Sequence, residues 1–148
     1  MGREASIELD CSRYSNKIID IINLLNECGW KYYNTKKKVE YLPLGDVDSF
    51  NWQDDFFSEN ELQELVNKKQ NQLELVGLDL FYENSMVGVT LLARDTKKIM
   101  LSLDINRKKL GNDRESLTDV SWYFNNIIQK LIARNCPVDY INFEEYTD

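Results

Sequence analysis

Three stretches in the middle of the chain alternate apolar and polar residues, which is the pattern of a half-buried β-strand. They span residues 75–82, 86–93 and 99–105, and each has an apolar side chain at every second position. The segments between them are short, as in the turns that join neighbouring antiparallel strands. The pattern therefore predicts an antiparallel meander. Gly77 and Gly88 lie inside these strands, where a glycine indicates a β-bulge or the close approach of another segment.

Apolar residues at intervals of three and four predict three amphipathic helices. Ser58 and Glu61 form a capping box, so the second helix should begin at residue 59 and run towards residue 70. Gly29 can end the first helix, and Pro137 follows the third. The candidate N-caps of the three helices are Ser12 or Ser15, Ser58, and Thr118 or Asp119. The apolar stripes are Ile18, Ile21, Ile22, Leu25 and Cys28, then Leu62, Leu65 and Val66, then Val120, Phe124, Ile127, Ile128 and Leu131.

The remaining segments complete the predicted arrangement. Residues 30–33 and 39–42 flank a polar turn and predict a hairpin, and residues 138–143 predict a last strand. Residues 46–57 lie between this hairpin and the second helix and predict an irregular loop, at a length typical of functional loops. We therefore expect an α+β fold with an antiparallel sheet, three packed helices and the order αββ-αβββ-αβ.

Length and composition indicate one folded domain. The 148 residues are 43% hydrophobic and 29% charged, as in ordinary globular proteins, so we expect a single domain over residues 1–148. Residues 1–11 are expected to form a disordered N-terminal segment. The cysteines, Cys11, Cys28 and Cys136, are odd in number and far apart, which favours reduced thiols. With no apparent signal peptide or membrane span, these features predict a cytoplasmic protein.

The negative charge is concentrated in one block. The chain has 25 acidic and 18 basic residues, and eight of the acidic ones lie between Lys38 and Lys68, where no basic residue occurs. Once those eight are set aside, 17 acidic and 18 basic residues remain. Nucleic acids and anionic membranes repel such a chain, so neither is expected as a partner. A concentrated negative field suits the capture of a basic protein.

Several kinds of catalytic site are excluded by the residue types present. The chain has no histidine, which removes Ser-His and Cys-His nucleophile pairs and every histidine-containing zinc site. No phosphate-binding glycine loop occurs either. Asp46 and Asp48 resemble a D-x-D metal-ligand pair, but the calcium-loop template fails at Asn51, where glycine is required, and at Phe57, where glutamate is required. We expect no cofactor and no metal.

The acidic block and its aromatic neighbours are the candidate binding site. The candidate contact residues are Asp46, Asp48, Trp52, Asp54, Asp55, Phe56 and Glu59. In this interpretation one or two of the aromatic side chains are partly exposed interface anchors, a role in which tryptophan contributes disproportionately. The alternative is that the aromatic residues pin the loop to the sheet and that the carboxylates form only its solvated side.

Two segments, GDVDSFNW at 45–52 and TDVSWYF at 118–124, together with the small, acidic, histidine-free character of the chain, resemble bacterial immunity proteins. These are proteins that bacteria produce beside polymorphic or contact-dependent growth inhibition toxins. The resemblance implies a stoichiometric inhibitor that binds a cognate basic toxin domain, often a nuclease. The acidic block suits this task independently, because a nuclease surface is positive where it holds phosphates.

Two other classes of function stay open on the sequence. The first is an adaptor or regulatory module with an acidic docking surface. The second is an enzyme that depends on carboxylates and on a metal ion, although nothing in the sequence selects a catalytic pair among the 25 acidic residues. The inhibitor hypothesis predicts a protein without catalytic activity of its own.

Overall fold

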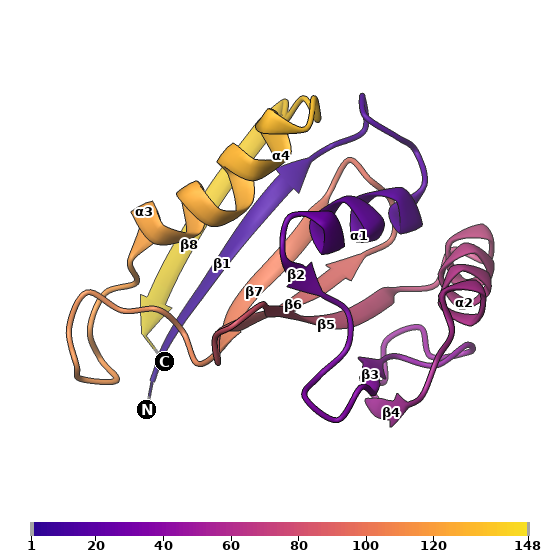
Figure 1. Cartoon of the computed structure of the whole chain (residues 1–148), viewed down its shortest axis with the longest axis horizontal. Coiled ribbons are helices and arrows are strands. Elements are labelled where there is room, and N and C mark those ends of the chain that lie inside the picture. The colour runs from indigo at the N-terminus through magenta and orange to yellow at the C-terminus, as the bar shows by residue number, and fades with distance from the viewer. Residues whose placement is uncertain (1, 148) are drawn as a thin grey trace.

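The protein is a single α+β domain built on one antiparallel sheet of eight strands, as a computed structural model of residues 2–147 shows (Figure 1). The strands follow the order β4-β3-β5-β6-β7-β1-β8, and β2 also pairs with β5. Every strand pair is antiparallel, which confirms the predicted fold class. The strands are β1 (Arg3–Asp10), β2 (Trp30–Lys31), β3 (Val39–Tyr41), β4 (Gln53–Asp55), β5 (Val76–Tyr82), β6 (Gly88–Ala93), β7 (Ile99–Ile105) and β8 (Tyr140–Thr147).

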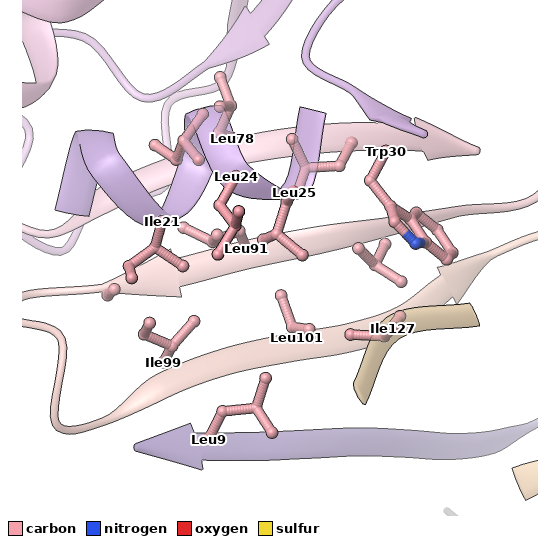
Figure 2. Packing of buried hydrophobic residues seen from close by; sticks show 14 of the residues in the cluster. Leu9, Ile21, Leu24, Leu25, Trp30, Leu78, Leu91, Ile99, Leu101 and Ile127 are labelled. Carbon is pink, nitrogen blue, oxygen red and sulfur yellow. The ribbon is translucent and has the colours of Figure 1, made fainter. Parts of the chain in front are cut away.

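The helices pack against one face of this sheet. They are α1 (Ile18–Glu27), α2 (Glu59–Asn71) and a last helix made of α3 (Val120–Tyr123), η1 (Phe124–Ile128) and α4 (Gln129–Ala133). All of them contribute to one core, together with the apolar positions of the strands. Side chains of α1 point towards Leu91 and Leu101 of the sheet (Figure 2). Among residues 2–147, no helix is long and apolar enough to cross a membrane.

The central meander and the second helix agree with the sequence prediction. Strands β5, β6 and β7 pair consecutively, with a register irregularity between Gly88 and Thr90. The capping box of α2 is present: Ser58 Oγ accepts from the amide of Glu61, and the Glu61 carboxylate accepts from the amide of Ser58. Asp119 caps the last helix by accepting from the amide of Trp122.

The beginning of the chain differs from the prediction. Arg3–Asp10 forms β1 between β7 and β8, whereas residues 1–11 were expected to be disordered; residue 1 lies outside the described residues. The segment alternates Ala5, Ile7 and Leu9 on its buried side with polar residues on the other side. This is the ordinary pattern of a half-buried strand. The sheet depends on β1, because β1 joins β8 to the meander.

Two further predictions fail near the acidic block. Residues 30–33 and 39–42 do not form a hairpin, because β2 and β3 both pair with β5 instead of with each other. Residues 46–57 are not wholly irregular, because Gln53–Asp55 forms β4 along the edge of β3. The first helix begins later than its candidate caps: Lys17 is the N-cap residue, while Ser15 Oγ donates to Asp20 and accepts from the amide of Lys17.

The last helix is interrupted by a π-helical turn, and the turn coincides with a contact to the core. The carbonyl of Asn126, inside η1, accepts a hydrogen bond of 2.8 Å from Nε1 of Trp30. Trp30 is fully buried, so its indole N–H requires a partner within the protein. A π-helical turn redirects backbone carbonyl groups away from the regular helical pattern. Here the indole N–H of Trp30 donates a hydrogen bond to one of these carbonyl groups.

Candidate acidic binding face

A row of polar and acidic side chains crosses the face of the sheet opposite the helices. Paired residues lie on the same side of a sheet, so the strand registers define a row that crosses it from β4 to β8. The row consists of Asp54, Glu40, Asp79, Thr90, Ser102, Ser6 and Glu144. Glu40 lies beside Asp79 in this row because Tyr41, the next residue of β3, pairs with Leu78. We call this side of the sheet the open face.

Three side chains at the centre of the open face share hydrogen bonds. Thr90 Oγ1 lies 2.7 Å from Oδ1 of Asp79 and 3.0 Å from Oδ1 of Asp104. A hydroxyl group has one proton, so it can donate to only one of the two carboxyl groups. The other contact becomes a hydrogen bond only when that carboxyl group is protonated. The geometry therefore favours a proton held within the group.

Burial raises the pKa of Asp79 to about 6, and the neighbouring charges of Glu40 and Asp104 act in the same direction. The hydrogen bond from Thr90 opposes this shift but does not cancel it. Burial also raises the pKa of Asp104. None of the ion pairs among residues 2–147 involves Glu40, Asp79 or Asp104. The centre of the open face is thus a cluster of carboxyl groups without a compensating cation.

An exposed tryptophan lies beside this cluster. Trp52 is 38% exposed and lines a shallow hollow of about 180 Å³ together with Glu40, Gln53, Asp54 and Asp79. The polypeptide that leads to β4 brings the indole ring over the sheet, because Trp52 directly precedes Gln53 and lies on the same side of β4 as Asp54. Asp54 also lies 4.0 Å from the ammonium group of Lys38, whereas Glu40 and Asp79 have no ion pair among residues 2–147. A half-exposed aromatic ring next to these two carboxyl groups can contact the aliphatic stem and the cationic head of a basic side chain.

The structure separates the candidate contact residues predicted from the sequence. Asp54 and Trp52 lie on the open face. Asp55 lies on the opposite side of β4, where its carboxylate accepts a 2.5 Å hydrogen bond from the hydroxyl of Tyr41. Burial, followed by this bond to Asp55, raises the pKa of Tyr41 to about 12.

The other candidates are exposed outside the row. Phe56 is 67% exposed, and the ammonium group of Lys38 lies 5.3 Å from the centre of its ring. Asp48 is exposed in the loop, and Glu59 is exposed in the first turn of α2. These three side chains are accessible, but they do not belong to the row that crosses the sheet.

Asp46 has a structural environment that sets it apart from the other candidates. It is 7% exposed, and its carboxylate accepts hydrogen bonds from the amides of Ser49 and Asn51 at 2.8 and 2.7 Å. The bond from Asn51 is the main reason why the pKa of Asp46 lies below its usual value. Both oxygens of Asp46 thus organise the loop, which leaves this carboxylate a structural role.

A buried lysine fixes the same loop to α2. Lys69 is 1% exposed, and its Nζ donates to the carbonyl oxygens of Pro43 at 2.6 Å and Asp46 at 3.0 Å. Its Nζ also lies 3.5 Å from Oε1 of Glu74, which accepts from the amide of Gly45. Lys69 and Glu74 therefore attach the loop to α2 through polar contacts. The alternative interpretation of the sequence assigned this attachment to the aromatic residues instead.

Asp79, Thr90 and Asp104 were not recognised as candidate residues from the sequence. The sequence contained the necessary information. Each of these residues lies at a polar position of an alternating strand whose apolar positions were identified correctly. A comparison of the polar positions of the three neighbouring strands would have placed these side chains together. Among residues 2–147, no group of three or more Cys, Asp or Glu residues is arranged to hold a metal ion.

Comparisons with known protein families, with curated proteins and with solved structures found no match for this chain.

Proposed function

We propose that this protein is a stoichiometric inhibitor, of the immunity-protein class, that binds a basic toxin domain through its open face. The observation that carries the proposal is the cluster of carboxyl groups at the centre of the open face: Glu40, Asp79 and Asp104 have no cationic partner among residues 2–147. Uncompensated carboxylates on an exposed surface attract a positively charged protein and accelerate its encounter.

The partly exposed ring of Trp52 supports the same proposal. Interfaces combine charged surroundings with a few large aromatic side chains that limit dissociation. Trp52 stands next to Asp54 and Asp79 on the open face, so a partner that contacts the carboxylates also meets the indole ring. Phe56, Glu59 and Asp48 are also exposed and complete the set of candidate contacts.

A nuclease domain is the partner whose chemistry fits best. Its substrate groove is basic because it binds phosphates, and an acidic protein surface can occupy that groove in place of the nucleic acid. The inhibitor would act in the cytoplasm of the producing cell, without a cofactor and without catalysis of its own.

The test measures how a basic nuclease toxin domain binds two variants of the inhibitor. The double variant Glu40→Lys with Asp54→Lys should lower the association rate about tenfold or more and weaken its dependence on salt. Trp52→Ala should raise the dissociation rate by about tenfold or more. The matched control is Glu27→Lys with Glu64→Lys, which makes the same change in net charge at exposed positions of α1 and α2.

The proposal requires that the control leave binding nearly unchanged. Equal losses in the open-face variant and in the control would show that only net charge matters. A Trp52→Ala variant that loses stability but keeps its dissociation rate would assign the indole to loop attachment alone. An adaptor would bind through the same face, but a titration of toxin activity would then show no inhibition at one equivalent.

A further inference from the structure

Strands β1 and β7 stop pairing before either strand ends. Their register runs only as far as Ser6 and Ser102, although β1 begins at Arg3 and β7 continues to Ile105. A hollow of about 660 Å³ lies at this end, lined by both strands and by the loop that joins β7 to α3. That volume is in the range of small-molecule sites and is more than a bare ion requires.

The hollow carries more positive than negative side chains. Its charged lining consists of Arg3, Arg107, Lys109 and Arg114, with the carboxyl groups of Glu4 and Asp104. Lys109 and Arg114 take part in no ion pair among residues 2–147. Burial raises the pKa of Asp104 and so favours its neutral form. A local positive excess of this kind stands out in a chain whose net charge is −7.

A single buried carboxylate holds two of the arginines in place. Glu145 lies 3.8 Å from Nε of Arg3 and 3.5 Å from Nη1 of Arg107, and its side chain is 9% exposed. The side chain of Arg107 is also 9% exposed. One carboxylate offsets only one of the two guanidinium charges. The other charge therefore remains on side chains that are already fixed, so a ligand would not have to order them.

The two arginines also attach the loop to the strands, beside the start of β1 (Figure 1). Nε of Arg3 donates to the carbonyl of Glu115, and Nη2 of Arg107 donates to the carbonyl of Arg114, both at 3.0 Å. These bonds leave part of each guanidinium group unused, because it has five N–H groups. Among residues 2–147, no hydrogen bond uses Nη1 or Nη2 of Arg3, or Nε of Arg107.

We infer that this hollow binds a small molecule that carries a phosphate group. A phosphate group has close to two negative charges at neutral pH and three acceptor oxygens. Guanidinium groups bind such oxygens through paired hydrogen bonds, and the unused donors of Arg3 and Arg107 are available for them. Ser102 and Asn106 also line the hollow and offer polar groups to the rest of the molecule.

The surroundings favour a small phosphate compound over a nucleic acid. A long polyanion would extend past the hollow onto the open face, where Asp79 and Glu144 belong to the carboxyl row. Those carboxyl groups would repel its successive phosphates. A compact ligand meets the cations of the hollow without reaching the row. A monocarboxylate is the weaker candidate, because its single charge offsets fewer of the cations.

Isothermal titration calorimetry of the full chain tests the inference. The probes are inorganic phosphate and glycerol 3-phosphate, with acetate as the singly charged comparison and chloride added to keep the ionic strength constant. We expect one site per chain for both phosphates, tighter binding of glycerol 3-phosphate, and binding of acetate weaker by about tenfold or more. Backbone amide NMR signals that shift with phosphate should be those of residues 3–5, 102–109 and 114.

Two variants distinguish ligand contacts from attachment of the loop. Arg3→Lys keeps the charge but loses the planar fork, so the dissociation constant for phosphate should rise about tenfold while the melting temperature changes little. Lys109→Gln with Arg114→Gln should raise it about tenfold as well. The matched control is Lys68→Gln with Lys97→Gln, which makes the same change in net charge at exposed positions far from the hollow in sequence and should leave binding unchanged.

Four results would overturn the inference. The first is the absence of saturable phosphate binding at millimolar concentrations. The second is an equal loss of binding in the Lys109 and Arg114 variant and in its control, because net charge alone would then attract phosphate. The third is phosphate binding that shifts amide signals elsewhere in the chain. The fourth is a single-stranded oligonucleotide that shifts the same amides and binds more tightly than glycerol 3-phosphate. The proposed inhibitor function is tested separately, because Glu40, Trp52 and Asp54 do not line this hollow.

Discussion

The indole ring of Trp52 lies against Gly77, with its Cη2 only 3.1 Å from the position that a β-carbon on Gly77 would occupy. Leu42 fills the same space, and its Cδ1 lies 2.5 Å from that position. Glycine is therefore required in the middle of β5, because both side chains approach its backbone on the open face. This contact fixes where the indole stands relative to Glu40 and Asp79.

Gly77→Ala should lower the free energy of unfolding by about 1–3 kcal/mol, the usual cost of an added methyl group in a packed site. It should also move the indole away from the sheet and change the tryptophan fluorescence of the folded protein. Urea denaturation and emission spectra measure the two effects. Gly2→Ala is the control, because no atom lies within 4 Å of a β-carbon at that position. Equal stability of Gly77→Ala and the wild type would contradict the close contact.

Asp79→Asn should stabilise the protein at pH 8 and have little effect at pH 4. The folded-state pKa of Asp79 is raised to about 6, above the value of about 3.9 in an unfolded chain. The folded state therefore holds this proton more tightly, and the stability of the wild type falls as the pH rises from about 4 to about 6. Above pH 6 the neutral amide should gain about 1–2 kcal/mol relative to the ionised wild type, after allowance for solvent screening.

Unfolding free energies of both proteins between pH 4 and pH 8 check this sign. The difference should grow through the window between the two pKa values and then become constant. A carbon-13 NMR titration of the Asp79 carboxyl group gives the pKa directly. An Asp79→Asn variant that is less stable than the wild type at pH 8 would show that the ionised carboxylate contributes favourable bonds that outweigh its burial.

The local pattern of the sequence predicted those elements whose partners are close along the chain. The meander from β5 to β7 and the capping box at Ser58 depend on alternation and on residues three positions apart, and both were located correctly. β1 carries the same alternation, but its partners β7 and β8 are about 90 or more residues away in sequence, and a strand without a nearby partner was mistaken for a disordered terminus.

The candidate site shows the same limit in another form. The acidic block and its aromatic residues identified Asp54 and Trp52, which are on the open face, but grouped them with Asp46, whose carboxylate binds loop amides. Asp79 and Asp104 join Asp54 on one surface only through strand registers, and those registers cannot be read from charge density. Whether a carboxylate faces solvent or a backbone amide is decided by the path of the loop.

The three cysteine thiols should react slowly in the folded protein. Cys11, Cys28 and Cys136 are free and buried, and burial is the main reason why the pKa of each thiol is raised. The reactive thiolate is therefore scarce at neutral pH. Titration with a thiol reagent should detect three groups per chain after denaturation without reductant, and almost none before it. Rapid reaction of any one thiol in the native protein would contradict its burial.

Lys69→Met should destabilise the loop between β3 and β4 more than any exposed lysine substitution. The side chain of Lys69 is buried, and it holds the carbonyl oxygens of Pro43 and Asp46 as well as Glu74. Methionine can fill the volume but cannot donate hydrogen bonds, so two carbonyl groups and a buried carboxylate lose a partner. Removing one member of a buried ion pair costs about 3 kcal/mol or more.

Two measurements separate a local effect from general unfolding. Urea denaturation should show the loss of stability, and chymotrypsin should cleave faster after Phe50, which is 51% exposed in the loop that Lys69 anchors. Lys68→Met is the matched control, because the neighbouring lysine is exposed in the same turn of α2. If both variants resisted urea and protease as the wild type does, Lys69 would not anchor the loop. If Lys69→Met also weakened partner binding without unfolding the protein, binding through the open face would require an ordered loop. The reason is that the same segment positions Trp52 above Gly77.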